Sequence, residues 1–85
     1  METLKPELKT LMLMVSNWRR GYETWLTPGD NDYVFEEFVS DIKMHISPYV
    51  ERLLAIDYIT QAEGTEFFLY IMEQVDELKR KADEL

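Results

Sequence analysis

The sequence predicts an all-α fold: one domain over residues 1–85, built as a small bundle of four helices. Two long stretches, one at each end of the chain, carry apolar residues at alternating spacings of three and four. This heptad rhythm places a stripe of apolar side chains along one side of a helix. No segment alternates apolar and polar residues as a half-buried strand does. The first and last helices are therefore expected to be long, with shorter helices between them.

The first helix is expected to begin near Pro6, because proline at the first helical position lacks only an N–H that has no partner there. Thr27-Pro28-Gly29 ends it, since proline disfavours helical geometry in the preceding residue and Pro-Gly favours a tight turn. The stripe along this helix consists of Leu4, Leu8, Leu11, Val15, Trp18, Tyr22 and Trp25.

Two shorter helices are expected in the middle of the chain. The Asp-Asn-Asp run at 30–32 suits a helix N-terminus, which predicts a helix from about Asp32 to Ile46. Its inner face would hold Phe35, Phe38, Val39, Ile42 and Ile46. Ser47-Pro48 repeats the start signal and predicts a further helix from Pro48 to about Asp57. If Pro48 only kinks a continuous helix, the bundle has three helices instead of four.

The last helix is expected from about Gln61 to Asp83. Thr60 and Glu63 have the spacing of a capping box, in which each side chain accepts a hydrogen bond from the other residue's backbone. Acidic residues near the start and basic residues near the end complement the helix dipole. The stripe of this helix consists of Phe68, Ile71, Val75, Leu78, Ala82 and Leu85.

Charge is distributed unevenly along the chain, which has a net charge of −8. Residues 30–77 hold twelve carboxylates and only two basic residues, a net charge of −10. Nucleic acids and anionic lipids are polyanions, so this surface argues against binding either of them directly. It suits a basic protein partner, or it serves only to keep the protein in solution.

Several classes of protein are disfavoured. The chain has no cysteine, so it has neither a disulfide framework nor a thiolate metal site. Its apolar runs, such as Leu11 to Val15, are far shorter than a membrane span, and no signal peptide is recognisable. The single histidine has no serine at a suggestive spacing, and there is no glycine-rich phosphate loop. We expect a cytoplasmic protein that is not an enzyme and needs no cofactor.

Two acidic patterns suggest metal binding, and each has a simpler interpretation. Glu37, Asp41 and His45 follow one another at intervals of four, which places them along one helix face. A solvated face with one side-chain pair explains the same spacing. Asp30, Asp32 and a following glutamate resemble a calcium loop, but the required glycine and third oxygen ligand are missing. Helix capping accounts for these residues, so no metal is predicted.

Aromatic and apolar residues off or beside the stripes predict either a broad core or an interface. Trp18 to Trp25 interleave aromatic and basic residues as single-strand nucleic-acid platforms do. Their heptad spacing favours a core or interface instead. Methionine and aromatic residues are adaptable contact groups at interfaces. The residues assigned to such a groove or oligomer seam are Trp18, Tyr22, Trp25, Phe67, Tyr70 and Met72.

The leading functional hypothesis is a non-enzymatic acidic module, a small regulator or inhibitor that docks on a basic partner protein, for example a nucleic-acid-binding one. Complementary charge across an interface gives specificity and fast association. The carboxylates assigned to this contact are Glu36, Glu37, Asp41, Glu51, Glu73, Asp76 and Glu77. The alternative is a structural module that forms homo-oligomers through its two heptad stripes.

Overall fold

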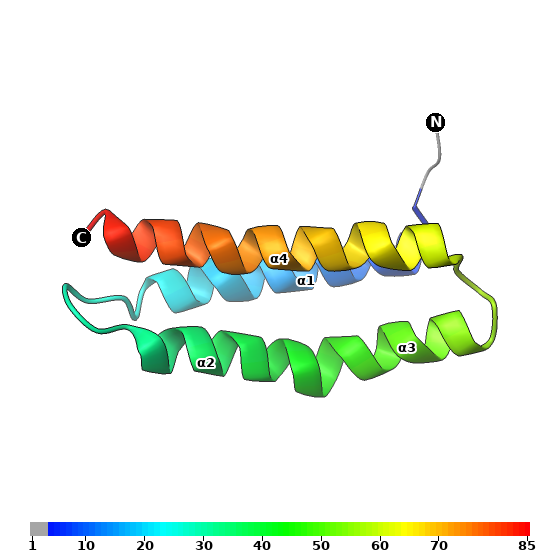
Figure 1. Cartoon of the computed structure of the whole chain (residues 1–85), viewed down its shortest axis with the longest axis horizontal. Coiled ribbons are helices and arrows are strands. Elements are labelled where there is room, and N and C mark those ends of the chain that lie inside the picture. The colour runs from blue at the N-terminus through cyan, green and yellow to red at the C-terminus, as the bar shows by residue number, and fades with distance from the viewer. Residues whose placement is uncertain (1–3) are drawn as a thin grey trace.

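Three helices run side by side along one long axis in the computed structural model, which describes residues 4–85 (Figure 1). The first is α1, Pro6–Glu23, and the last is α4, Gln61–Asp83. The middle helix has three consecutive parts: α2, Asp32–Asp41; the π-helical turn η1, Ile42–Ile46; and α3, Ser47–Ala55. Residues 4–85 contain no strand, so the all-α prediction is confirmed.

The four-helix count is not confirmed, because the middle helix continues through Pro48 without a break. In a regular α-helix the Pro48 ring would collide with the carbonyl of Met44, and its missing N–H would leave that carbonyl without a partner. The widened π turn that precedes Pro48 relieves this conflict. Within it the Ser47 N–H donates to the carbonyl of Ile42, five residues back instead of four. The alternative of three helices therefore describes this fold.

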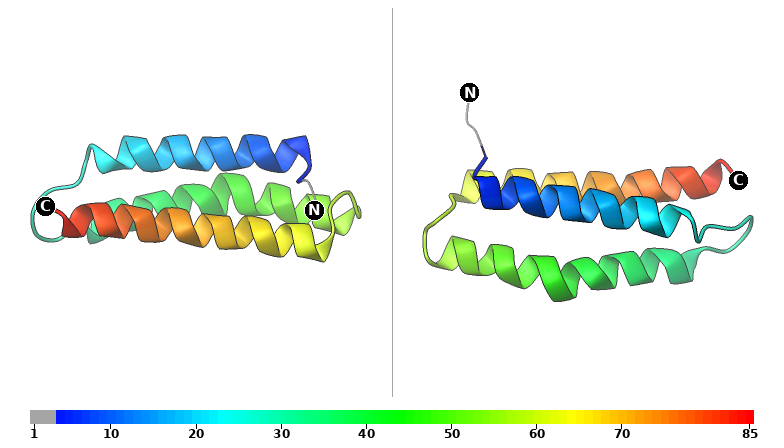
Figure 2. Two further views of the ribbon diagram at one scale, coloured as in Figure 1. Left: turned by 90° about the horizontal axis from the view of Figure 1, so that it is seen from above. Right: turned by 180° about the vertical axis from the view of Figure 1, so that it is seen from behind.

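The chain runs up, down and up, so that α1 and α4 are parallel to each other and antiparallel to the middle helix (Figures 1 and 2). Contact between α1 and α4 is the most extensive of any pair of elements. Two polar contacts tie them together: Tyr70 Oη donates to the Met12 carbonyl at 3.1 Å, and Arg19 Nε donates to Gln74 Oε1 at 2.7 Å. These contacts hold the first and last helices side by side within one chain.

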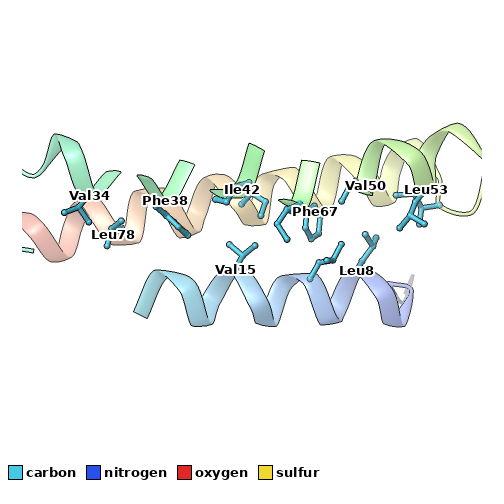
Figure 3. Packing of buried hydrophobic residues seen from close by; sticks show 13 residues of the cluster. Leu8, Val15, Val34, Phe38, Ile42, Val50, Leu53, Phe67 and Leu78 are labelled. Atoms are coloured by element: carbon cyan, nitrogen blue, oxygen red, sulfur yellow. The ribbon is translucent and has the colours of Figure 1, made fainter. Parts of the chain in front are cut away.

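All three helices contribute to one apolar core (Figure 3). Its buried members are Leu8, Leu11, Val15, Val34, Phe38, Ile42, Ile46, Val50, Leu53, Ile59, Phe67, Ile71 and Leu78. The α4 stripe was predicted through Phe68, but the fully buried ring is Phe67 and Phe68 is only partly buried. Helix α4 faces two neighbours at once, so its buried face is wider than a single heptad stripe. Val34, absent from the predicted inner face, is also buried.

Helix α1 ends at Glu23, before the predicted turn, and Trp25 is therefore 57% exposed. The loop that follows is held by the buried side chain of Asn31. Asn31 Oδ1 accepts the Thr27 N–H at 2.8 Å, and Nδ2 donates to the carbonyls of Thr27 at 2.7 Å and Gly29 at 3.3 Å. Gly29 has φ of +105°, which favours glycine. The buried Asn31 side chain thus holds this exposed turn in place through hydrogen bonds to its backbone.

Helix α3 ends at Ala55, two residues before the predicted end. Asp57 adopts the left-handed conformation, with φ of +58°, a common way to stop a helix. The Tyr58 N–H then donates back to the Leu53 carbonyl at 3.0 Å. The Tyr58 hydroxyl also donates to the Glu7 carboxylate at 2.8 and 2.9 Å, which ties this turn to the start of α1.

Helix α4 begins and ends as predicted, and its capping box is present. The Glu63 N–H donates to Thr60 Oγ1 at 3.1 Å, and the Thr60 N–H donates to Glu63 Oε1 at 2.9 Å. Glu63 is buried, and a buried carboxylate is costly unless it is hydrogen-bonded. The Thr60 N–H supplies that hydrogen bond.

The same hydrogen bond makes the stability of the fold depend on pH. The bond from the Thr60 N–H holds the pKa of Glu63 below its usual value. Ionised Glu63 therefore stabilises the fold above the unfolded pKa of about 4.3, and this stabilisation is lost as pH falls through the lower folded value. Urea unfolding measured near neutral pH and again at about pH 3 should show a larger loss of stability for the wild type than for Glu63→Gln. Equal losses would contradict the assignment.

Candidate protein-binding surface

A hollow of about 490 Å³, the α1/α2 pocket, lies between the C-terminal part of α1 and helix α2. It is lined by Asn17, Trp18, Gly21, Tyr22, Thr24, Trp25 and Asp41. Three of the five aromatic residues predicted for a groove or oligomer seam therefore meet Asp41, one of the carboxylates predicted for partner binding. Gly21 faces open space, since a Cβ atom there would meet no other atom within 4 Å. The absence of a side chain at this position leaves the pocket open to solvent.

Tyr22 is fixed in this pocket by its ring and by its hydroxyl. The hydroxyl donates a hydrogen bond to Asp41 Oδ2. The ring lies 5.6 Å from the Phe38 ring, centroid to centroid, and 5.6 Å from the Trp25 ring at an interplanar angle of 78°. Burial, together with the hydrogen bond to Asp41, raises the pKa of Tyr22 to about 12. The phenol therefore stays protonated near neutral pH and remains a donor to the carboxylate.

The predicted acidic alternatives for metal binding are not assembled into a metal site. Among residues 4–85, no group of three or more histidine and acidic side chains lies close enough to hold an ion. Asp41 accepts from Tyr22, and the His45 ring lies edge-on to the Trp18 ring at 6.3 Å. At the start of α2, Asp30 Oδ1 accepts the Asp32 N–H at 2.9 Å, as capping requires.

A second hollow, the α2/α4 groove, has a volume of about 560 Å³. It is lined by Phe35, Glu36, Val39, Ser40, Lys43, Met44, Val75 and Lys79. Glu36 is the only predicted partner-binding carboxylate in this lining, and it shares the groove with Lys43 and Lys79. The charge of the groove is therefore mixed, and its character differs from that of the α1/α2 pocket.

The predicted carboxylates do not form one cluster. Glu36, Glu37 and Asp41 lie on α2, Glu51 lies on α3, and Glu73, Asp76 and Glu77 lie on α4. The Glu77 carboxylate pairs with the guanidinium of Arg80, which holds the pKa of Glu77 below its usual value. Within residues 4–85 the remaining ion pairs join Arg19 to Glu23 at 2.7 Å and Lys81 to Glu84 at 4.0 Å.

Five of the seven carboxylates therefore have no basic partner and no side-chain hydrogen bond within the described chain. They are Glu36, Glu37, Glu51, Glu73 and Asp76, of which Glu37 is partly buried and the other four are exposed. Their negative charge is available to an outside partner.

The residues predicted for an oligomer seam are used differently. Phe67 is completely buried in the core of the single chain, which corrects its assignment to a surface groove. Tyr70 is partly buried, and its hydroxyl holds α4 to α1. Met72 is 61% exposed. Most residues of the α1 and α4 stripes lie in the core of the single chain or pack against it, whereas the stripe residues Trp25 and Leu85 are exposed.

Sequence reasoning missed the polar half of the pocket, although a signal was present. Asn17, Gly21 and Thr24 repeat the spacing of Trp18, Tyr22 and Trp25, one residue earlier. A row of small and polar residues beside a row of aromatic residues marks a helix face that is only half covered.

Comparison of the chain with protein-family models, curated proteins and solved structures gives no match. The α1/α2 pocket, the α2/α4 groove and the charged surface are therefore the features that bear on function. None of the helices in residues 4–85 combines the length and the apolar character that crossing a membrane requires.

Proposed function

We propose that this chain is a non-enzymatic acidic binding module that docks on a basic surface of another protein, as a small cytoplasmic regulator or inhibitor. The observation that carries the proposal is the set of five unpaired carboxylates on α2, α3 and α4. Unpaired surface charge of one sign raises the rate of encounter with a partner of the opposite sign and selects against the wrong partners.

The basic residues of the chain support this reading, because several of them are already engaged. Arg19 donates to Glu23 and Gln74, and Arg80 pairs with Glu77. Their charge is partly neutralised inside the chain, whereas most of the acidic charge of residues 30–77 is not. A polyanion would meet mainly repulsion over this surface, which favours a basic protein over nucleic acid.

Binding is favoured over catalysis by the nature of the hollows. The α2/α4 groove is lined mainly by apolar residues and lysine, and the α1/α2 pocket by aromatic and small polar residues around one carboxylate. Pockets of aromatic side chains with a single charge are suited to hold a group and fix its orientation.

The proposal is tested by charge reversal on an identified partner. The chain is used to capture proteins from a lysate of the cells that produce it, at low and at high salt, and a captured basic protein is then purified. We expect the pairs Glu36→Lys/Glu37→Lys and Glu73→Lys/Asp76→Lys each to weaken binding by about tenfold or more. The affinity should also fall as salt rises, because exposed charges are screened.

The matched control is Asp83→Lys/Glu84→Lys, which makes the same change in net charge at the basic end of α4. It should change the affinity by about twofold or less, since surface charges outside a contact contribute little. Unchanged affinity in both test pairs at physiological salt would refute docking through these carboxylates. An equal loss in the control would mean that only net charge matters.

A further inference from the structure

We propose that the α1/α2 pocket binds the guanidinium group of an arginine side chain, between its aromatic rings and the Asp41 carboxylate. The source of that arginine rests on the proposed function, because a basic partner surface presents such side chains. Binding of the group itself depends only on the chemistry of the pocket.

The aromatic part of the pocket suits a flat cation. Trp18, Tyr22 and Trp25 all line it, and the rings of Tyr22 and Trp25 stand nearly perpendicular to each other. An aromatic face attracts a cation placed over it, most strongly for tryptophan. Trp25 is more than half exposed, so an approaching side chain can reach its ring. The rings of Tyr22 and Trp25 therefore form a site that is accessible from solvent.

The Asp41 carboxylate supplies the matching charge. Its Oδ2 atom accepts the Tyr22 hydroxyl, and within residues 4–85 its Oδ1 atom takes part in no hydrogen bond or ion pair. Because Tyr22 stays protonated near neutral pH, the phenol fixes the carboxylate and adds no second negative charge. One oriented carboxylate oxygen beside aromatic rings is the arrangement that a guanidinium group fills by stacking and hydrogen bonding together.

Arginine fits this site better than lysine. A guanidinium is planar, carries several N–H donors and loses little hydration when it stacks on a ring, whereas an ammonium is compact and strongly hydrated. Charged groups also lie near the pocket: the Glu37 carboxylate contributes to the raised pKa of Tyr22, and the Arg20 guanidinium donates to Asn17 Oδ1. Arg20 is occupied by that contact.

The chain provides its own probe for the test, because its only two tryptophans both line this pocket. Tryptophan fluorescence is recorded while N-acetyl-arginine N-methylamide is added at constant ionic strength. The matched ligand is the citrulline analogue, which has nearly the same shape and no charge. We expect a saturable change with the arginine compound, none with the citrulline compound, and a weaker response with the lysine analogue.

Variants identify the groups responsible. Asp41→Asn keeps an acceptor for Tyr22 and removes the charge, so it should weaken arginine binding by about tenfold. Trp25→Leu should also weaken it, with the remaining signal from Trp18. Glu66→Gln, an exposed carboxylate on α4 that has been given no part in binding, is the control and should leave the titration unchanged. Far-UV circular dichroism confirms that each variant is folded.

Identical curves for the arginine and citrulline compounds, or wild-type affinity in Asp41→Asn, would overturn the assignment. A lysine analogue that binds as tightly as the arginine compound would overturn the choice of guanidinium. These results need no partner, so they are independent of the charge reversals on α2 and α4. With the purified partner, Asp41→Asn should lower its affinity as well; an unchanged affinity would refute the partner as the source of the arginine.

Discussion

Replacing Phe67 with alanine is expected to lower the free energy of unfolding by about 3–5 kcal/mol. The ring is completely buried where α4 faces both other helices, and the T-shaped contact with Phe68, 5.9 Å between centroids, would be lost with it. A chain of this size is stable by only about 5–15 kcal/mol, and small domains lie near the lower end. Urea unfolding followed by circular dichroism should therefore show a strongly shifted or absent transition.

Leu69→Ala is the matched control, two residues away on the same helix. Leu69 is 56% exposed, so its loss should change stability by no more than about 0.5 kcal/mol. The two variants together test which face of α4 is the core. A cost below about 1 kcal/mol for Phe67→Ala would contradict the packing of α4 described above.

Asn31→Ala is expected to destabilise the fold by about 1–3 kcal/mol. The substitution removes an acceptor for the Thr27 N–H and a donor to the Thr27 and Gly29 carbonyls, where the side chain is buried. The backbone groups of Thr27 and Gly29 would lose these partners, and hydrogen bonds lost at a buried side chain are only partly replaced by water. Thermal and urea unfolding measure the loss, and the transition should remain cooperative because the core is untouched.

Asp30→Ala serves as the neighbouring control. Asp30 is exposed and accepts only the Asp32 N–H, so its loss should cost less than the loss of Asn31. Asn31→Asp separates the two roles of the amide, because a carboxylate still accepts from Thr27 but cannot donate. Equal stability of Asn31→Ala and Asp30→Ala would refute the role assigned to this side chain.

Features that depend on neighbouring residues alone were predictable. Both ends of α4 agree with the sequence, because a capping box and a dipole-matched charge order act within one turn. The start of α1 at Pro6 is local in the same sense. The end of α1 was not predictable in this way. The helix stops at Glu23, and the loop that follows takes its hydrogen bonds from Asn31, which the apolar stripe of the helix does not reveal.

Features that depend on distant residues were predicted only in part. The heptad stripe selected Phe68, whereas burial of Phe67 follows from the presence of two neighbouring helices.

The candidate site was also predicted only in part. Its aromatic row and Asp41 were both identified, yet for separate roles, because only the antiparallel packing of α1 and α2 brings Tyr22 against Asp41. The sequence offered the parts of the pocket without their juxtaposition.

The π turn sets the angular phase of the middle helix. Its buried residues Val34, Phe38, Ile42, Ile46 and Val50 recur every four residues. In a regular α-helix each such step would rotate the buried side by about 40°, so the row would wind away from α1 and α4. A π turn advances fewer degrees per residue, so it offsets part of this rotation. The helix thereby holds one more residue than a straight α-helical face of this length would, and still presents a single side to its two neighbours.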